Sequence, residues 1–129
     1  MKKDKLILDV LEKSEREIRK LKEEVIETSK LFYLGYIEEG LKKIRFFSEV
    51  FSDFSFFWSD VFNLSQDEEL YNINIKFSDN ISNITDAIEK KDFILIGDLF
   101  HFSFPEVLER YIGIIPKIKE KIKGNGKGT

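Results

Sequence analysis

Hydrophobic residues recur at helical spacing along the first segment of the chain, residues 4–33. They step alternately by four and by three positions, which is the heptad pattern of a helix with one buried seam. The seam consists of Ile7, Leu11, Ser14, Ile18, Leu21, Val25, Thr28 and Phe32. Two of its positions are polar and it covers only about four heptads, so it favours a bundle helix over a two-stranded coiled coil. Gly35 is suited to end this helix in a left-handed conformation.

The second segment, residues 37–64, is rich in aromatic residues on one face. At 100° per residue, one arc collects Ile44, Phe47, Phe51, Phe54, Phe57, Trp58 and Val61. Beside it runs a stripe of serines at positions 48, 52, 55 and 59. This stripe is either a border where another helix approaches closely or a groove for a partner. A helix of about 28 residues, roughly 42 Å long, needs other helices packed against its aromatic face.

The third segment, residues 66–90, follows a turn in which Ser65 and Glu68 have the spacing of a capping box. Its apolar residues recur at helical spacing from Leu70 to Ile88. Within it, positions 70–77 also alternate as in a strand. No other segment offers a partner strand, so we predict a helix here.

The fourth segment begins near Asp92, a suitable N-cap, and carries an apolar stripe to Ile115. The stripe continues past Pro105, whose ring and missing N–H predict a kink around residues 101–104 rather than an end. Pro116 should end or bend the helix again. Residues 117–123 form a short basic amphipathic piece, and residues 124–129 should be a flexible tail.

Together the four segments predict an all-α protein. We expect an antiparallel four-helix bundle with long first and second helices and a fourth helix kinked at Pro105. A chain of 129 residues can bury roughly two-thirds of its unfolded surface. We therefore predict one domain, residues 1–123, followed by the tail.

The amino-acid composition indicates the cellular compartment more clearly than the function. The chain has no cysteine, which excludes disulfides and thiolate metal sites and fits a reducing compartment. Asp9 interrupts the only candidate signal segment, and no window has the uncharged length of a membrane span. We expect a cytoplasmic protein without membrane insertion. Residues 46–90 hold nine carboxylates against two lysines, which argues against nucleic-acid binding.

Candidate chemistry is sparse. A four-helix di-metal site needs Glu-x-x-His motifs, whereas the single histidine, His101, has Asp98 three positions before it. Asp98 and His101 could share a helix face for acid–base work, but a structural role for His101 beside Pro105 is favoured. We predict no enzyme activity, cofactor or metal. The alternative is a small ligand-binding or enzymatic bundle with a pocket near Trp58, Asp98 and His101.

The segment from Asp86 to Phe100, followed by Pro105 and Leu108, resembles a pattern in short all-helical proteins of Gram-positive-type bacteria. Those proteins read alanine-any-glutamate, aspartate-aromatic, aspartate-leucine-leucine and then proline-any-leucine, and residues 40–44 fit the same family. The resemblance covers about half of the chain. It implies an all-helical fold and no particular activity. Residues 101–104 replace a glutamate-rich stretch of the family, and the size and helicity are similar to those of flagellar export chaperones by analogy of fold alone.

The apolar sector of the second helix is wider than the stripe that a surface helix needs. We therefore predict a non-catalytic protein-interaction or adaptor/chaperone-like bundle that self-associates, as a homodimer, or binds a protein partner. The predicted interaction residues are Phe46, Phe56, Phe57 and Trp58.

Overall fold

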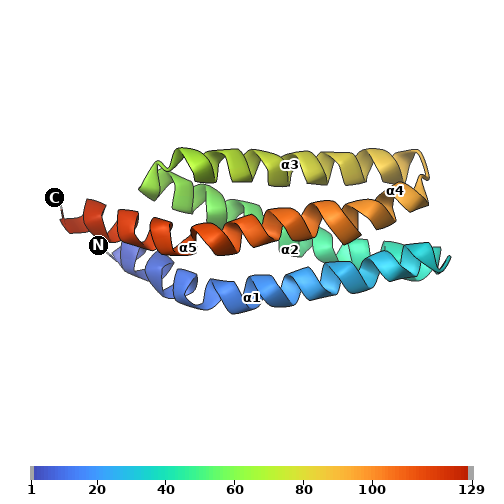
Figure 1. The fold of residues 1–129 in the computed structure, drawn as a ribbon, viewed down its shortest axis with the longest axis horizontal. Helices are drawn as coiled ribbons and strands as arrows, with labels where there is room; N and C mark the ends of the chain where they lie inside the picture. The colour runs from blue at the N-terminus through green and yellow to red at the C-terminus, as the bar shows by residue number, and fades with distance from the viewer. Residues whose placement is uncertain (1, 128–129) are drawn as a thin grey trace.

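The computed structural model describes residues 2–127, with the side chains of residues 2–124, and this part of the chain is helical apart from short turns. The elements are α1 (Lys2–Tyr33), α2 (Ile37–Ser65), α3 (Glu68–Glu89), α4 (Phe93–Asp98), the π-helical segment η1 (Leu99–Ser103) and α5 (Phe104–Lys127) (Figure 1). The all-helical prediction is confirmed, and residues 70–77 are helical.

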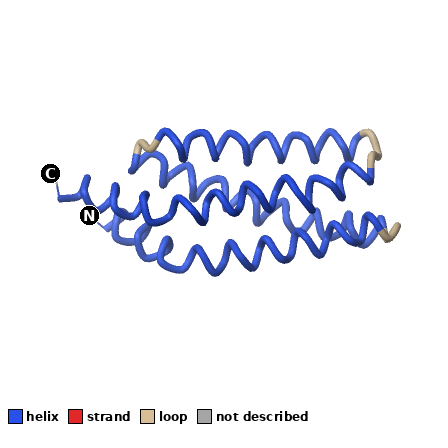
Figure 2. Tube along the Cα trace, in the orientation of Figure 1, coloured by secondary structure: helices blue, strands red, loops and turns tan. Residues whose placement is uncertain are grey.

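The chain turns back on itself between successive long helices (Figure 2). Figure 1 shows α1 beside α5, with α3 along the opposite edge and α2 behind. Ion pairs join α1 to α5, with Glu109 contacting Lys22 at 2.7 Å and Glu12 contacting Lys119 at 2.5 Å. This packing is consistent with the predicted bundle. In the described part of the chain, no helix is sufficiently long and apolar to cross a membrane.

Each of the three turns between the helices contains one residue in the left-handed backbone conformation. Gly35 has φ of 85°, as predicted, while Gln66 and Lys91 adopt φ of 51° and 53°. Asp92 caps α4 by accepting a hydrogen bond from the Leu95 amide at 3.1 Å, which confirms its predicted role.

The start of α3 differs from the predicted capping box. Ser65 is the last residue of α2, and Asp67 is the N-cap, accepting from the Leu70 amide at 2.9 Å. The Ser65 hydroxyl instead accepts from the Asp67 amide at 3.4 Å. The helix begins at Glu68 because Gln66 takes up the left-handed conformation that ends α2.

The predicted seam of α1 is buried at all eight positions. The two polar residues of the seam form their hydrogen bonds within α1. Ser14 donates to the Val10 carbonyl at 2.8 Å and Thr28 to the Glu24 carbonyl at 2.9 Å. Such bonds to the carbonyl four residues earlier remove the cost of burying a free hydroxyl.

An aromatic core lies between α2, α3 and α5. The Phe51 ring stacks on Phe104 with centroids 5.0 Å apart and meets Phe77 edge-on at 5.7 Å. The Tyr111 hydroxyl donates to the Asn74 side chain at 2.6 Å, and burial raises the pKa of Tyr111. Buried tyrosine is thereby held neutral and hydrogen-bonded.

The fourth predicted helix is continuous from α4 through η1 into α5. Pro105 does not end it, as predicted, and the irregularity is a π turn in which the Phe104 amide donates to the Leu99 carbonyl five residues earlier. Pro116 lies inside α5 without ending it. The helix runs to Lys127, past the predicted start of the tail at residue 124; residues 128–129 lie outside the described part.

Candidate interaction surfaces

The four predicted interaction residues have different environments. Phe46 and Phe56 are 60% and 72% exposed, Phe57 is half-buried, and Trp58 is only 1% exposed. The Trp58 ring packs against Tyr111 with centroids 4.7 Å apart, so almost none of its surface is open to a partner. Phe46 and Phe56 are ten residues apart on α2, or about 15 Å along its axis. They therefore border different surfaces.

Phe46 lies in a hollow between α1 and α2, which we call the Phe46 groove. It has a volume of about 500 Å³. Its apolar part is Leu31, Phe46 and Phe47, and its charged rim is Lys20, Glu23, Glu24, Glu27 and Lys43. Phe57 and Trp58 contribute to a separate hollow of about 400 Å³ farther along the same two helices. The rim of the Phe46 groove thus carries both signs of charge.

A second groove runs between α2 and α3, and we call it the serine groove. It consists of two hollows of about 330 and 310 Å³ that share Ser55. One wall is the whole predicted serine stripe, Ser48, Ser52, Ser55 and Ser59. The floor and opposite wall include Phe51, Tyr71, Phe77, Ile81, Ile84, Ile88, Phe100 and Tyr111. The small side chains of the stripe leave α2 and α3 separated by an open apolar groove.

A polar cluster joins the end of α1 to the π turn. The Tyr33 hydroxyl donates to Asp98 at 2.5 Å, and its ring lies over Gly97, where an added Cβ would meet Tyr33 at 2.8 Å. Partial burial and the hydrogen bond to Asp98 raise the pKa of Tyr33 to about 12. Tyr33 is therefore a neutral donor at ordinary pH and holds Asp98 in place.

His101 contacts Ser29 rather than Asp98. The Ser29 hydroxyl donates to the Ile26 carbonyl at 2.5 Å and lies 3.3 Å from His101 Nδ1. Which of the two groups donates in this contact depends on the tautomer of His101. Ser29 is also fully buried. This pair joins the π turn to α1.

The structure does not bring Trp58 together with Asp98 and His101. Trp58 packs on Tyr111 in the aromatic core, whereas Asp98 and His101 contact Tyr33 at the end of α1. None of the hollows described above has all three residues in its lining. Within residues 2–127, no group of three or more histidine or acidic side chains is arranged to hold a metal ion.

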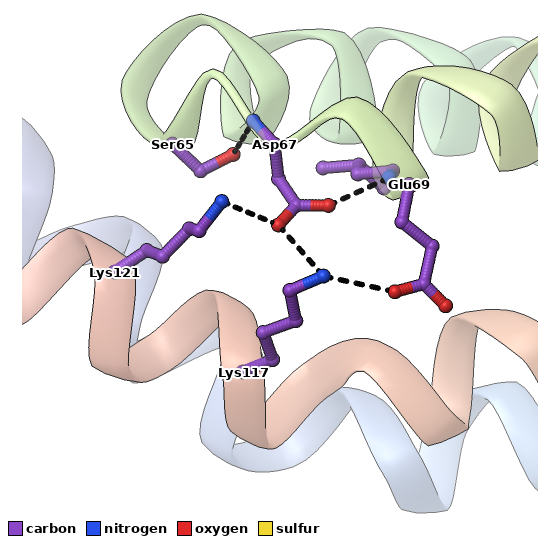
Figure 3. Close-up of polar contacts among 6 residues, drawn as sticks. Ser65, Asp67, Glu69, Lys117 and Lys121 are labelled. Atoms are coloured by element: carbon purple, nitrogen blue, oxygen red, sulfur yellow. Dashed lines mark hydrogen bonds and ion pairs between the residues drawn. The ribbon is translucent and has the colours of Figure 1, made fainter.

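Sequence reasoning missed a buried ionic cluster at the turn between α2 and α3 (Figure 3). Asp67 is fully buried, and its Oδ2 lies 2.7 Å from the Lys121 ammonium and 3.2 Å from that of Lys117, both on α5. Burial by itself would raise the pKa of the carboxyl, but bonds from Lys121, the Leu70 amide and Lys117 lower it to about 2. The signal was the i,i+4 lysine pair, whose target 50 residues earlier is not local in sequence.

A family model described as a domain of unknown function (DUF8042) matches residues 9–114, which include α1 from Asp9 onward, all of α2, α3, α4 and η1, and α5 as far as Ile114. No curated protein matches the chain. No solved structure matches it either.

Proposed function

The chain belongs to the family described as a domain of unknown function (DUF8042), and we propose its function from the surfaces of the structure. The protein is a non-catalytic interaction module of the adaptor or chaperone type, with an antiparallel four-helix bundle as its scaffold. It self-associates as a homodimer through α2. The single observation that carries this proposal is the exposed Phe46 ring beside an apolar groove with a rim of mixed charge.

The Phe46 groove suits a two-fold contact with a second copy. In such an interface each copy presents the same patch, so a ring that fits the partner's groove is matched by the partner's ring in its own. Burying one exposed phenylalanine contributes about 1.5–3 kcal/mol, and symmetry supplies it twice. Lys20 and Lys43 of one copy can face Glu23 and Glu27 of the other, which avoids like-charge opposition.

The polar groups near His101 support the non-catalytic part of the proposal. The Ser29 hydroxyl donates a hydrogen bond to a backbone carbonyl, and Asp98 accepts a hydrogen bond from the Tyr33 hydroxyl. Each group therefore has a structural partner that explains its position. The acidic stretch from residue 46 to 90 favours protein partners over nucleic acid, and the cysteine-free composition fits the cytoplasm.

Sedimentation velocity across about 1–100 µM tests the self-association, a range that detects micromolar dissociation constants. We expect a concentration-dependent dimer that Phe46→Glu converts to a monomer. Phe56→Glu is the matched control, because it places the same charge at an even more exposed ring on the same helix. A wild-type monomer throughout the range, or equal dimerisation by the Phe46→Glu variant, would refute the proposal.

A further inference from the structure

The serine groove is a second surface, separate from the one assigned to self-association. We propose that it binds a basic amphipathic helix of another protein, with the apolar face of that helix in the groove and its lysines or arginines against the acidic outer faces of α2 and α3. This extends the proposed interaction function to a defined class of partner and does not depend on Phe46.

The dimensions of the serine groove fit a helix. Its lining extends from Ile44 to Phe62 on α2 and from Tyr71 to Ile88 on α3. At 1.5 Å per residue these spans are about 27 Å and 25 Å, the length of a helix of about 18 residues. Such a partner would present apolar side chains at i, i+3, i+4 and i+7 to the groove.

The walls of the groove allow close approach. Four serines form the α2 wall, and their side chains extend far less than the phenylalanines next to them. Phe51, Phe77 and Phe100 form a buried apolar floor below them. Phe56 lines neither hollow, but it is exposed one helical turn from Ser52, so we expect it to cover the docked helix.

Charge around the groove selects a basic partner. Glu49 on α2 lies one turn from the groove-lining Ser52, and Glu89 on α3 lies one turn from Thr85. Asp60 and Asp86 are exposed farther out on the same two helices, while three exposed cations, Arg45, Lys90 and Lys91, stand near one end of the groove. A second copy of this face would oppose carboxylate to carboxylate, and a fatty-acid headgroup would meet the same repulsion.

The test measures binding of a fluorescent 18-residue peptide, roughly the length of the groove, with leucines on one helical face and lysines elsewhere. We expect micromolar binding to the folded protein, with induced peptide helicity by circular dichroism and tighter binding at low salt. A peptide of the same composition with scattered leucines, and one with glutamates in place of the lysines, should bind at least about tenfold more weakly.

Variants of the protein locate the site. Ser55→Phe fills the point that the two hollows share and should abolish binding, whereas Asn83→Phe, at an exposed position of α3 outside the groove lining, should not. Glu49→Lys with Glu89→Lys should weaken binding about fivefold or more. Asp9→Lys with Glu120→Lys makes the same change in net charge at other exposed positions and should weaken it much less.

Several results would overturn the inference. These are absence of peptide binding by folded wild-type protein at about 100 µM, equal binding by the Ser55→Phe variant, or equal binding of the acidic peptide. Binding of a fluorescent fatty acid without the peptide would assign the groove to acyl chains, and a dimer lost in the Ser55→Phe variant would assign it to a second copy. Phe46→Glu should leave peptide binding intact, which separates failure here from failure of the self-association proposal.

Discussion

Replacing Asp67 by asparagine tests the ionic cluster that fastens the α2–α3 turn to α5. Asparagine keeps an oxygen for the Leu70 amide and is as good an N-cap as aspartate, so the substitution removes the charge and retains the cap. Lys121 loses its carboxylate partner and Lys117 keeps Glu69, and both lysines are about half exposed. They can turn to water, so no unpaired charge is left buried.

The pKa of Asp67 gives the size of the expected loss of stability. Its lowering from the ordinary 3.8 to about 2 corresponds to about 2.5 kcal/mol, at about 1.4 kcal/mol per pH unit. Water around the two lysines reduces this, so we expect Asp67→Asn to cost about 1–2.5 kcal/mol at pH 7. Because the folded-state pKa is the lower one, the contribution is complete above about pH 4 and is lost as the pH falls through the folded pKa of about 2.

Urea unfolding of the wild type and the variant from pH 7 to pH 2 measures this difference. Glu69→Gln is the matched control, because Glu69 is exposed and contacts only one of the same lysines, Lys117, at 2.9 Å. We expect that control to cost under about 0.5 kcal/mol. Equal stability of wild type and Asp67→Asn at pH 7, or a difference that persists unchanged to pH 2, would show that the lysines do not stabilise this turn.

Two further substitutions examine the cluster at the π turn. His101→Gln should cost under about 1.5 kcal/mol by urea unfolding and leave self-association unchanged; a folded variant that lost it would show that His101 has a direct functional role. Gly97→Ala should be neutral or destabilising in the wild type, because its Cβ meets Tyr33, but stabilising by about 0.5–1 kcal/mol in a Tyr33→Ala background, where the normal helical preference for alanine returns. The same effect in both backgrounds would contradict the close contact.

Sequence patterns predicted the elements well wherever one face alone is buried. The seam of α1 was correct at every position because a regular heptad admits one buried face. Asp92 and Gly35 were predicted because their roles depend on neighbours within a few residues. Trp58 was placed among the interaction residues, but its burial depends on Tyr111, which is 53 positions away.

The π turn and the serine groove were not predicted, because the sequence spacing in each place is compatible with more than one structure. Apolar residues at 96, 100, 104 and 108 are spaced by four three times in succession, and on an α-helix each such step rotates the stripe by 40°. A wider turn absorbs that rotation, but Pro105 suggested a kink as the simpler explanation. The serine stripe was compatible with a closed border or with a groove, since its spacing does not fix the distance between α2 and α3.

The π turn also affects how members of this family can differ in length. Its hydrogen bond closes over five residues where an α turn closes over four, so η1 contains one residue beyond what a regular helix needs. Loss of one residue here, at the exposed Phe102 for example, would leave a plain α-helix with α4 and α5 still facing the core. Loss of one residue within α5 itself would instead rotate every later side chain by 100° about the helix axis. A one-residue gap at positions 99–103 therefore preserves the fold when relatives are aligned.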